Sequence, residues 1–437
     1  MADQQTRILP VHRLSKVPAN KSLAEWWADE NSKGTAEASA VIEASEALRS
    51  SDIPVGFPTE TVYGLGADAT RSAAVQGIYK AKKRPSDNPL IIHVDSIEMI
   101  NRLLNPTTTT TTPSTKIPAI YEPLISRFWP GPLTILLPNP PGSLLAKEVT
   151  ANLPTFGVRM PSSAFARLLI HVTDRPLAAP SANASTKPSP TTAQHVYHDL
   201  KGRINLILDG GACGVGVEST VVDGLSSPPA ILRPGGIGIE EIRACPGWEN
   251  VQVGYHDSAL QHGKEAPRAP GMKYRHYSPK ARVILFEAGS DLPSITGRVK
   301  QDLLGTGFST ETRRKIGIVR TRKWPVTIAL TPDAELAQSA ESQSQEVLAE
   351  DESNGVSAVR IREVSVLLEE GIGATVYDID LGSEAEAIAR GLFAALRSLD
   401  ELNVDAIYIE GIRDDEGDLA AAVMNRIRKA AEVSVAI

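Results

Sequence analysis

Cysteine is scarce in this sequence, since Cys213 and Cys245 are the only two among 437 residues. Two thiols cannot form a disulfide framework and are too few for a four-ligand zinc site, which excludes disulfide-stabilised secreted domains and zinc fingers. We expect two free thiols in a reducing compartment. Aromatic residues are also few, at 5%, and no aromatic stacking pair stands beside the basic residues, which argues against a surface for single-stranded nucleic acid.

Long apolar runs are missing as well. No stretch approaches the roughly 20 apolar residues of a membrane-spanning helix. The N-terminus lacks the apolar core of a signal peptide, and Asp3 is atypical of a transit peptide. These absences predict a soluble, cytoplasmic protein that makes no contact with a membrane.

Two common nucleotide-binding fingerprints are absent too. The chain contains no Gly-x-x-x-x-Gly-Lys-Ser/Thr sequence, so it is not a P-loop enzyme. Gly64-x-Gly66 lacks the third glycine of a dinucleotide-binding turn. Residues 210–216 are glycine-rich, but they lie between two predicted strands and open no helix, so a plain tight turn is an equally good interpretation.

What the chain does have is length and an uneven charge. A chain of 437 residues is expected to form two domains, and 42% hydrophobic with 22% charged residues is a globular composition. The net charge is −7, and residues 281–437 hold 17 Lys and Arg against 27 Asp and Glu, which leaves +3 for residues 1–280. We therefore expect a basic site in the first part, and extensive contact with nucleic acid is not expected in the second.

Apolar strands alternate with amphipathic helices, which predicts an α/β fold. Residues 105–117 contain six consecutive threonines and are expected to form a disordered surface insertion. The predicted parts are an irregular lead-in over 1–35, a first domain over 36–245, a Pro- and Gly-rich linker over 246–280 and a smaller α/β domain over 281–437.

The stretch from Val55 to Val94 organises the first domain. An apolar strand leads into a turn rich in Gly and hydroxyl groups, and a helix then carries the chain to a second apolar strand. The predicted elements are a strand over 53–57, a helix over 70–83 with Thr70 or Ser72 as its N-cap, and a strand over 90–94.

Four cations lie between Lys80 and Arg84, where Pro85 ends the helix. A basic helix end is often only solvated and favourable to the helix dipole. Asn88 and His93 follow at once, however, and two strand ends that present donors and cations to one place suggest a site for an anionic ligand. A nucleoside triphosphate would need several such donors.

Other polar side chains also stand at the ends of apolar strands. Arg159 ends a strand that should be buried, which calls for an acidic partner or an anionic ligand. His93 could be an ordinary structural histidine, Ser181-x-Asn183 a local turn and Ser219 a plain strand residue. The prediction of a site depends on the coincidence of all these segments.

These segments resemble one protein family in combination. The sequences Pro58-Thr59-Glu60-Thr61-Val62-Tyr63-Gly64-Leu65-Gly66, Lys82-x-Arg84-Pro85-x-x-Asn88-Pro89-Leu90, Ala179-Pro180-Ser181-Ala182-Asn183 and Leu232-Arg233-Pro234-Gly235 are similar to motifs of the YrdC/Sua5 family. Residues 269–277 resemble the linker, and residues 422–430 part of the C-terminal domain, of the two-domain Sua5 type.

The resemblance implies a fold and a reaction. The first domain would be a YrdC-like twisted, open, mixed sheet with helices around a cationic cavity, followed by a smaller Rossmann-like α/β domain. Members of the family are L-threonylcarbamoyladenylate synthases, which make threonylcarbamoyl-AMP and pyrophosphate from L-threonine, bicarbonate and ATP. The product is passed to a tRNA threonylcarbamoyl transferase complex for adenosine 37 of tRNAs that read ANN codons, and direct tRNA binding would be weak or absent.

The resemblance also implies residue roles. Lys82 and Arg84 would be catalytic and contact the ATP phosphates, assisted by Mg²⁺. Further ATP contacts would come from Asn88, Thr155, Ser181, Asn183, Ser189, Arg233 and Tyr274. L-Threonine would be bound by Thr59, Thr61, His93, Arg159, Ala179 and Ser219, with Arg159 on its carboxylate. Lys273, Tyr274 and His276 would form a lid that excludes water.

Two alternatives stay open at this point. One is a non-catalytic RNA-binding or translation-fidelity module that uses the same basic cavity. The other is carbamoyl transfer from carbamoyl phosphate, as in hydrogenase-maturation relatives of the fold, although those carry zinc fingers that two cysteines cannot build.

Overall fold

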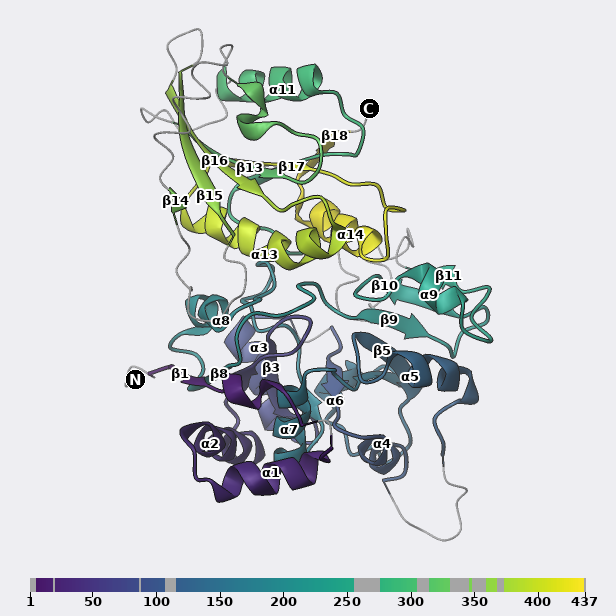
Figure 1. The fold of residues 1–437 in the computed structure, drawn as a ribbon. Helices are drawn as coiled ribbons and strands as arrows, with labels where there is room; N and C mark the ends of the chain where they lie inside the picture. The colour runs from purple at the N-terminus through teal and green to yellow at the C-terminus, as the bar shows by residue number, and fades with distance from the viewer. Residues whose placement is uncertain are drawn as a thin grey trace. The chain divides into compact units, whose positions relative to one another are not determined.

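The computed structural model describes residues 5–18, 20–85, 88–106, 115–254, 276–304, 314–330, 346–347, 359–367 and 373–435. The chain divides into two compact units. Unit 1 comprises residues 1–185 and 189–274, and unit 2 comprises residues 186–188 and 275–437. Each unit is an α/β structure built on its own sheet (Figure 1).

Unit 1 contains a mixed sheet in the order β1-β8-β2-β3-β7-β4-β6-β5-β9-β10-β11. Its strands are β1 (Arg7–Pro10), β2 (Val55–Phe57), β3 (Gly64–Asp68), β4 (Ile91–His93), β5 (Leu133–Pro138), β6 (Thr155–Arg159), β7 (Leu177–Ala178), β8 (Leu206–Asp209), β9 (Thr220–Asp223), β10 (Ala230–Arg233) and β11 (Gln252–Val253). Its helices are α1 (Leu23–Ser32), α2 (Ala36–Ser50), α3 (Ser72–Lys82), α4 (Ile97–Leu104), α5 (Glu122–Phe128), α6 (Lys147–Thr150), α7 (Ala164–Thr173), α8 (Ala193–Leu200) and α9 (Ile239–Arg243).

The strands at the centre of unit 1 are short and buried on both faces. Strands β2, β3 and β4 are buried throughout, and helices α1, α2 and α7 pack together beneath the sheet in Figure 1. Parallel pairs (β4 with β6, β5 with β9) alternate with antiparallel pairs (β2 with β3, β5 with β6). This arrangement confirms the prediction of a mixed sheet covered by helices.

Strand β3 is a correction to the sequence interpretation, which read residues 58–66 as a turn before a helix. Gly64 and Gly66 instead belong to a strand antiparallel to β2. A side chain at Gly66 would have its Cβ 2.8 Å from the Phe57 ring. The glycines therefore make room for an aromatic ring across the hairpin, which is why a signal usually typical of turns occurs inside a strand.

Two further predictions for unit 1 are wrong in detail. The predicted irregular lead-in over 1–35 contains regular structure among its described residues, because β1 pairs in parallel with β8 and α1 begins with a capping box between Ser22 and Glu25. The N-cap of α3 is Arg71, because the Thr70 hydroxyl donates to Asp68 instead (2.7 Å). Of the threonine-rich insertion, residues 107–114 lie outside the described residues.

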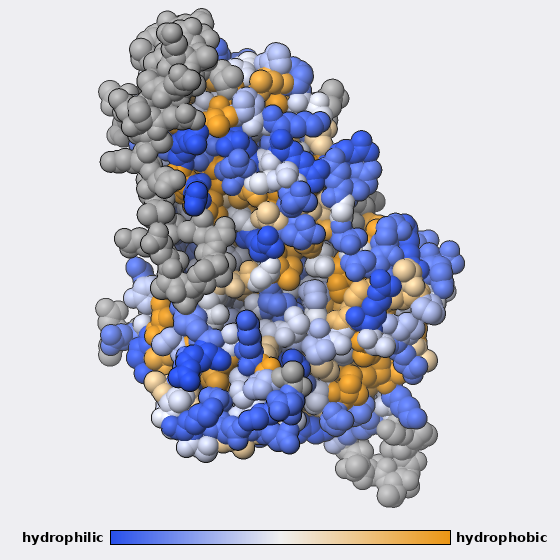
Figure 2. Space-filling model, viewed as in Figure 1, coloured by the Kyte–Doolittle hydropathy of each residue, from blue (hydrophilic) through white to orange (hydrophobic). Residues whose placement is uncertain are grey.

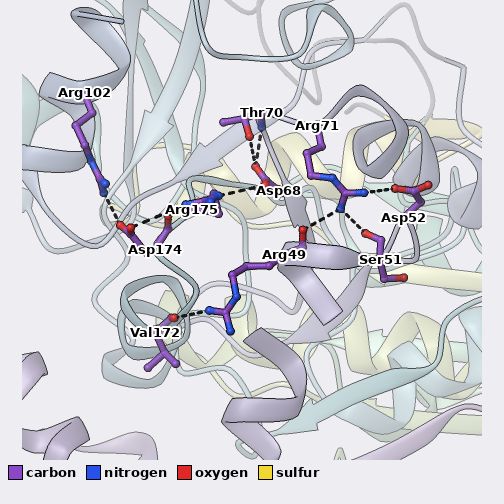
Figure 3. Close-up of polar contacts among 10 residues, drawn as sticks. All are labelled: Arg49, Ser51, Asp52, Asp68, Thr70, Arg71, Arg102, Val172, Asp174 and Arg175. Atoms are coloured by element: carbon purple, nitrogen blue, oxygen red, sulfur yellow. Dashed lines mark hydrogen bonds and ion pairs between the residues drawn. The ribbon is translucent and has the colours of Figure 1, made fainter. Parts of the chain in front are cut away.

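Arginine side chains form hydrogen bonds that link helices α2 and α7 to their neighbours in unit 1 (Figure 3). The Arg71 guanidinium donates to the carbonyls of Arg49 (3.2 Å) and Ser51 (2.9 Å) at the end of α2. Arg49 in turn donates to the Val172 carbonyl in α7 (2.9 Å). Carbonyls at a helix end lack partners within the helix, so these contacts satisfy them and hold α2 against its neighbours.

Unit 2 contains a second sheet in the order β14-β15-β16-β13-β17-β12-β18. The described strands are β12 (Arg282–Phe286), β13 (Arg314–Arg320), β14 (Glu346–Val347), β15 (Ile361–Leu367), β16 (Gly373–Asp380), β17 (Ala406–Glu410) and β18 (Val433–Val435). The helices are α11 (Leu292–Leu304), α13 (Ala385–Glu401) and α14 (Ala420–Ala430). Strands β16, β13, β17, β12 and β18 are parallel, as predicted for a Rossmann-like domain, while β15 and β14 are antiparallel.

Hydrophilic residues cover most of the face drawn in Figure 2, and apolar residues appear between them in separate areas. Among the helices in the described part of the chain, none is both long and apolar enough to span a bilayer.

Candidate active site

The first candidate group forms where α3 ends. Lys83 adopts a left-handed conformation (φ 52°) that stops the helix at Lys82, one residue before the predicted end. The Lys82 side chain is 2% exposed, and its ammonium donates to the carbonyls of Ser181 and Asn183 (2.6 Å for Asn183). The predicted Lys-x-Arg and Ser-x-Asn segments, 99 residues apart between Lys82 and Ser181, therefore meet.

The Ser-x-Asn turn is fixed to the start of β3. Leu65 donates its N–H to the Pro180 carbonyl (2.8 Å), and Ala182 donates to the Tyr63 carbonyl (2.8 Å). Within the turn, the Ser181 hydroxyl donates to Oδ1 of Asn183 (2.6 Å). These contacts hold the turn beside the loop that precedes β3.

Arg84 and Asn88 lie close together. Nη2 of Arg84 is 3.5 Å from the Asn88 carbonyl and 3.3 Å from the Pro89 carbonyl. The Tyr79 hydroxyl lies within hydrogen-bond distance of the same Asn88 carbonyl (3.0 Å) and of the Glu148 carbonyl (2.9 Å), which connects this loop to α3 and α6. Oδ1 of Asn88 is buried and accepts no hydrogen bond from any described residue.

The second group surrounds Arg159, which is 3% exposed. Its Nη1 donates to Oγ1 of Thr61 (2.9 Å), and Thr61 and Thr59 share a hydrogen bond of 2.9 Å. Its Nη2 lies 2.9 Å from Oε1 of Glu60. The acidic partner that a buried arginine calls for is thus Glu60, from the same loop as both threonines.

His93 is the neighbour of Arg159 across β4 and β6. It is 4% exposed, and its Nδ1 has no hydrogen-bond partner among the described residues. Burial lowers the pKa of His93 well below 6.5, and the positive charges of Arg159 and Arg233 lower it further. The imidazole is therefore neutral near pH 7.

Arg233 and Ser219 form the third group. Arg233 donates through Nε (3.0 Å) and Nη2 (2.9 Å) to the Ser219 carbonyl, and the Ser219 hydroxyl shares a bond with Thr134 (2.8 Å). A Cβ at Gly235 would lie 2.2 Å from the Thr220 nitrogen, so only glycine allows β10 to end this close to Ser219. Ser189 is buried and donates to Glu218 (2.5 Å).

The remaining predicted residues differ in where they lie. Thr155 stands at the opposite end of β6 from Arg159, and no described hydrogen bond of its side chain joins it to the other candidates. Ala179 is buried and donates its N–H to the Ile91 carbonyl (3.0 Å). Lys273 and Tyr274 lie outside the described residues, and His276 belongs to unit 2, where its N–H donates to the Lys429 carbonyl (3.3 Å).

Sequence reasoning assigned no role to Glu60, Thr134 or Glu218, which the structure places in contact with candidate residues. The sequence did contain a signal that could have identified Glu60. It stands between two selected threonines, and the buried Arg159 was expected to need an acidic partner. The sequence contains no comparable signal for Thr134 and Glu218, because neither belongs to a local pattern and the partner of each is distant in the sequence.

The described residues contain no group of three or more His, Cys, Asp or Glu that could hold a metal ion such as Mg²⁺. Mg²⁺ in nucleotide enzymes is bound largely by substrate phosphates and water, so a dedicated cage is not required.

In unit 2, a carboxylate occupies the edge of the sheet where open α/β sheets bind ligands. Glu410 ends β17 and is 5% exposed. Four successive N–H groups after β13 donate to it, those of Thr321 (2.7 Å), Arg322 (3.0 Å), Lys323 (2.5 Å) and Trp324 (3.2 Å). The N–H groups of this loop could bind an anion, but they already donate to the Glu410 carboxylate of the same chain.

Two family models match the chain. One, described as telomere recombination, covers residues 46–235, and one described as the C-terminal domain of threonylcarbamoyl-AMP synthase covers residues 237–432. Proteins named threonylcarbamoyl-AMP synthase are similar along most of their length. That of Schizosaccharomyces pombe is 44% identical over 410 residues, 90% of this chain and 89% of that protein. That of Bacillus subtilis is 37% identical over 408 residues, 93% of this chain and 97% of that protein.

Among solved structures, Pyrococcus abyssi Sua5 complexed with L-threonine matches with a TM-score of 0.70 at 34% identity, covering 99% of this chain and 100% of that chain. This likeness confirms the predicted fold class, and both family models confirm the resemblance drawn from the motifs. The chain therefore belongs to the YrdC/Sua5 family, in its two-domain Sua5 form.

Proposed function

We propose that this protein is an L-threonylcarbamoyl-AMP synthase, which uses L-threonine, bicarbonate and ATP and releases pyrophosphate. One observation carries the proposal: a single loop, residues 58–63, contacts the first group of candidate residues and belongs to the second. Its Tyr63 carbonyl accepts from Ala182 of the Ser-x-Asn turn, and its Thr61 hydroxyl accepts from Arg159. Donors for a triphosphate and donors for an amino acid thus flank the same loop, and we propose that they line one cavity.

The proposed reaction needs charge and position more than a covalent nucleophile. Bicarbonate takes up a proton and loses water to give CO₂, and the threonine amine then adds to CO₂ and loses a proton, which gives a carbamate. A carbamate oxygen then attacks the α-phosphorus of ATP, forming a P–O bond as the bond to pyrophosphate breaks. Lys82 and Arg84 would stabilise the phosphate charges, with Mg²⁺ carried on the phosphates supplying further charge. Arg159 would hold the threonine carboxylate.

The other predicted roles are part of the same proposal. Nucleotide contacts are assigned to Asn88, Thr155, Ser181, Asn183, Ser189, Arg233 and Tyr274. Contacts with L-threonine are assigned to Thr59, Thr61, His93, Ala179 and Ser219. Lys273, Tyr274 and His276 would cover the site as a lid, and the product would pass in the cytoplasm to a tRNA threonylcarbamoyl transferase complex for adenosine 37 of tRNAs that read ANN codons.

The test is pyrophosphate release from ATP by the full chain, with L-threonine and bicarbonate supplied together, singly and not at all. We expect release only when both are present, with threonylcarbamoyl-AMP identified by its mass. Release that does not depend on threonine would contradict the proposal and favour another carbamoyl chemistry. No release, together with tight binding of tRNA, would favour the RNA-binding alternative, which no present observation supports.

A further inference from the structure

The guanidinium of Arg159 makes a hydrogen bond at Nη1 and an ion pair at Nη2, and its Nε has no partner among the described residues. Nη1 donates to Thr61, whereas Nε and Nη2 are buried and make no hydrogen bond to any described residue. Nε and Nη2 are the two parallel donors with which arginine binds a carboxylate in bidentate fashion. Buried donors are rarely left without acceptors unless a ligand supplies them.

Glu60 compensates the charge of Arg159 at the Nη2 end of this edge, where the two side chains form an ion pair. Its Oε1 lies 2.9 Å from Nη2, yet neither atom makes a hydrogen bond, so the contact is an ion pair alone. Oε2 accepts instead from the N–H of Ser163 at the start of α7 (3.3 Å), and the Glu60 carbonyl accepts from Val215 (2.8 Å). One backbone N–H therefore holds the carboxylate, and another holds the backbone of Glu60.

The charge of Glu60 also acts on a second cation, Arg167. Arg167 on α7 is partly buried, and its Nε likewise lacks a hydrogen-bond partner among the described residues. Burial lowers the pKa of Arg167, while Glu60 and Asp95 act against that shift. One carboxylate thus acts electrostatically on two guanidinium groups, and its charge offsets both positive charges in a poorly solvated place.

We infer that Glu60 is a positioning residue for amino-acid binding: it fixes the Arg159 guanidinium through charge and leaves the Nε–Nη2 edge directed at the α-carboxylate of the substrate. This inference rests on the proposed function. It assigns selectivity for a free carboxylate to the Glu60–Arg159 pair, because an ester or amide lacks the negative charge and the two equivalent acceptor oxygens that pair best with that edge.

The test compares Glu60→Gln, Arg159→Lys and the double variant with the wild type, and uses Glu46→Gln, an exposed glutamate on α2, as the matched control. Glutamine keeps the size of the side chain and an acceptor for Ser163 but removes the charge. We expect the KM for L-threonine to rise roughly 10- to 100-fold in Glu60→Gln, with the KM for ATP and the melting temperature nearly unchanged. The double variant should be no worse than Arg159→Lys, because both act on one edge.

A second readout uses L-threonine amide. The wild type should prefer L-threonine strongly, and this preference should shrink in Glu60→Gln. An unchanged KM for L-threonine in Glu60→Gln would overturn the inference. So would equal losses for ATP and L-threonine together with a lower melting temperature, because these indicate a purely structural role.

Failure of the proposed function would look different. A wild type that releases no threonine-dependent pyrophosphate would refute the reaction, and calorimetric binding of L-threonine and acetate to both proteins would still decide the role of Glu60. Weaker binding of these carboxylates to Glu60→Gln would support the positioning role, and equal or absent binding would refute it.

Discussion

His93 and Arg159 are register partners on the parallel strands β4 and β6, and both side chains are buried. A histidine in this position is next to a permanent positive charge, with Arg233 a second one nearby. A protonated imidazole would be repelled by both arginines and would be poorly solvated, so the folded protein keeps His93 neutral. Neutral His93 can accept or donate one hydrogen bond to a ligand without adding charge to the site.

The lowered pKa of His93 predicts a pH dependence of stability. The unfolded chain binds a proton at His93 near the ordinary pKa of 6.5, whereas the folded chain does so only at lower pH. The unfolded state therefore binds more protons as pH falls through 6.5, and the free energy of unfolding decreases, by up to about 1.4 kcal/mol per pH unit. Above about pH 7.5 neither state is protonated and the contribution is constant.

This prediction is checked by urea unfolding between pH 8 and pH 5.5 for the wild type and His93→Gln. The wild type should lose stability more steeply below pH 7 than the variant. Parallel curves for the two proteins would show that His93 titrates alike in both states and would contradict the structural account.

Lys82→Ala should abolish threonine-dependent pyrophosphate release, by at least about 100-fold, because the ammonium is held at the Ser-x-Asn turn where the phosphates are proposed to bind. Arg84→Ala should have a similar effect. Lys80→Ala is the matched control, since Lys80 is an exposed residue of the same helix. Equal activity of the Lys80 and Lys82 variants would remove the basic cluster from the reaction.

Gly235→Ala should damage both stability and activity. The added Cβ would lie 2.2 Å from the Thr220 nitrogen and 2.4 Å from the Glu218 carbonyl oxygen, so β9 and β10 must separate beside Ser219. Overpacking of this kind costs about 1–3 kcal/mol. In contrast, Gly214→Ala adds a methyl group with nothing within 4 Å and should be nearly neutral. Thermal melting of the Gly235→Ala and Gly214→Ala variants tests this prediction. Equal melting temperatures would mean that β9 and β10 can move apart without a loss of stability.

Glu410→Ala should destabilise unit 2. It removes the acceptor of four buried or half-buried N–H groups in residues 321–324. Each unsatisfied group costs about 1–3 kcal/mol, partly recovered by water, so a total loss of at least about 3 kcal/mol is expected. Urea unfolding measures it, with the exposed Glu386→Ala on α13 as the control. A Glu410→Ala loss no larger than the control's would mean that water replaces the carboxylate fully.

The strands and helices that the sequence predicted well are those with strong periodicity. Strand β2, helix α3 and strand β4 all lie within the predicted ranges 53–57, 70–83 and 90–94. Strand β3 was missed because its two glycines are explained only by the Phe57 ring across the hairpin. Strand β1 was missed because four residues carry little pattern, and their place is set by pairing with β8, some 200 residues later.

The same division holds for the site. The sequence by itself determined which polar residues end the apolar strands, since Lys82, Ser181, His93 and Arg159 could each be selected from local pattern and motif. Only the tertiary structure decided that Lys82 binds the Ser-x-Asn turn and that Glu60 faces Arg159. The physical reason is that local sequence sets strand ends and helix ends, whereas buried charges are compensated across contacts between distant segments, which no single stretch encodes.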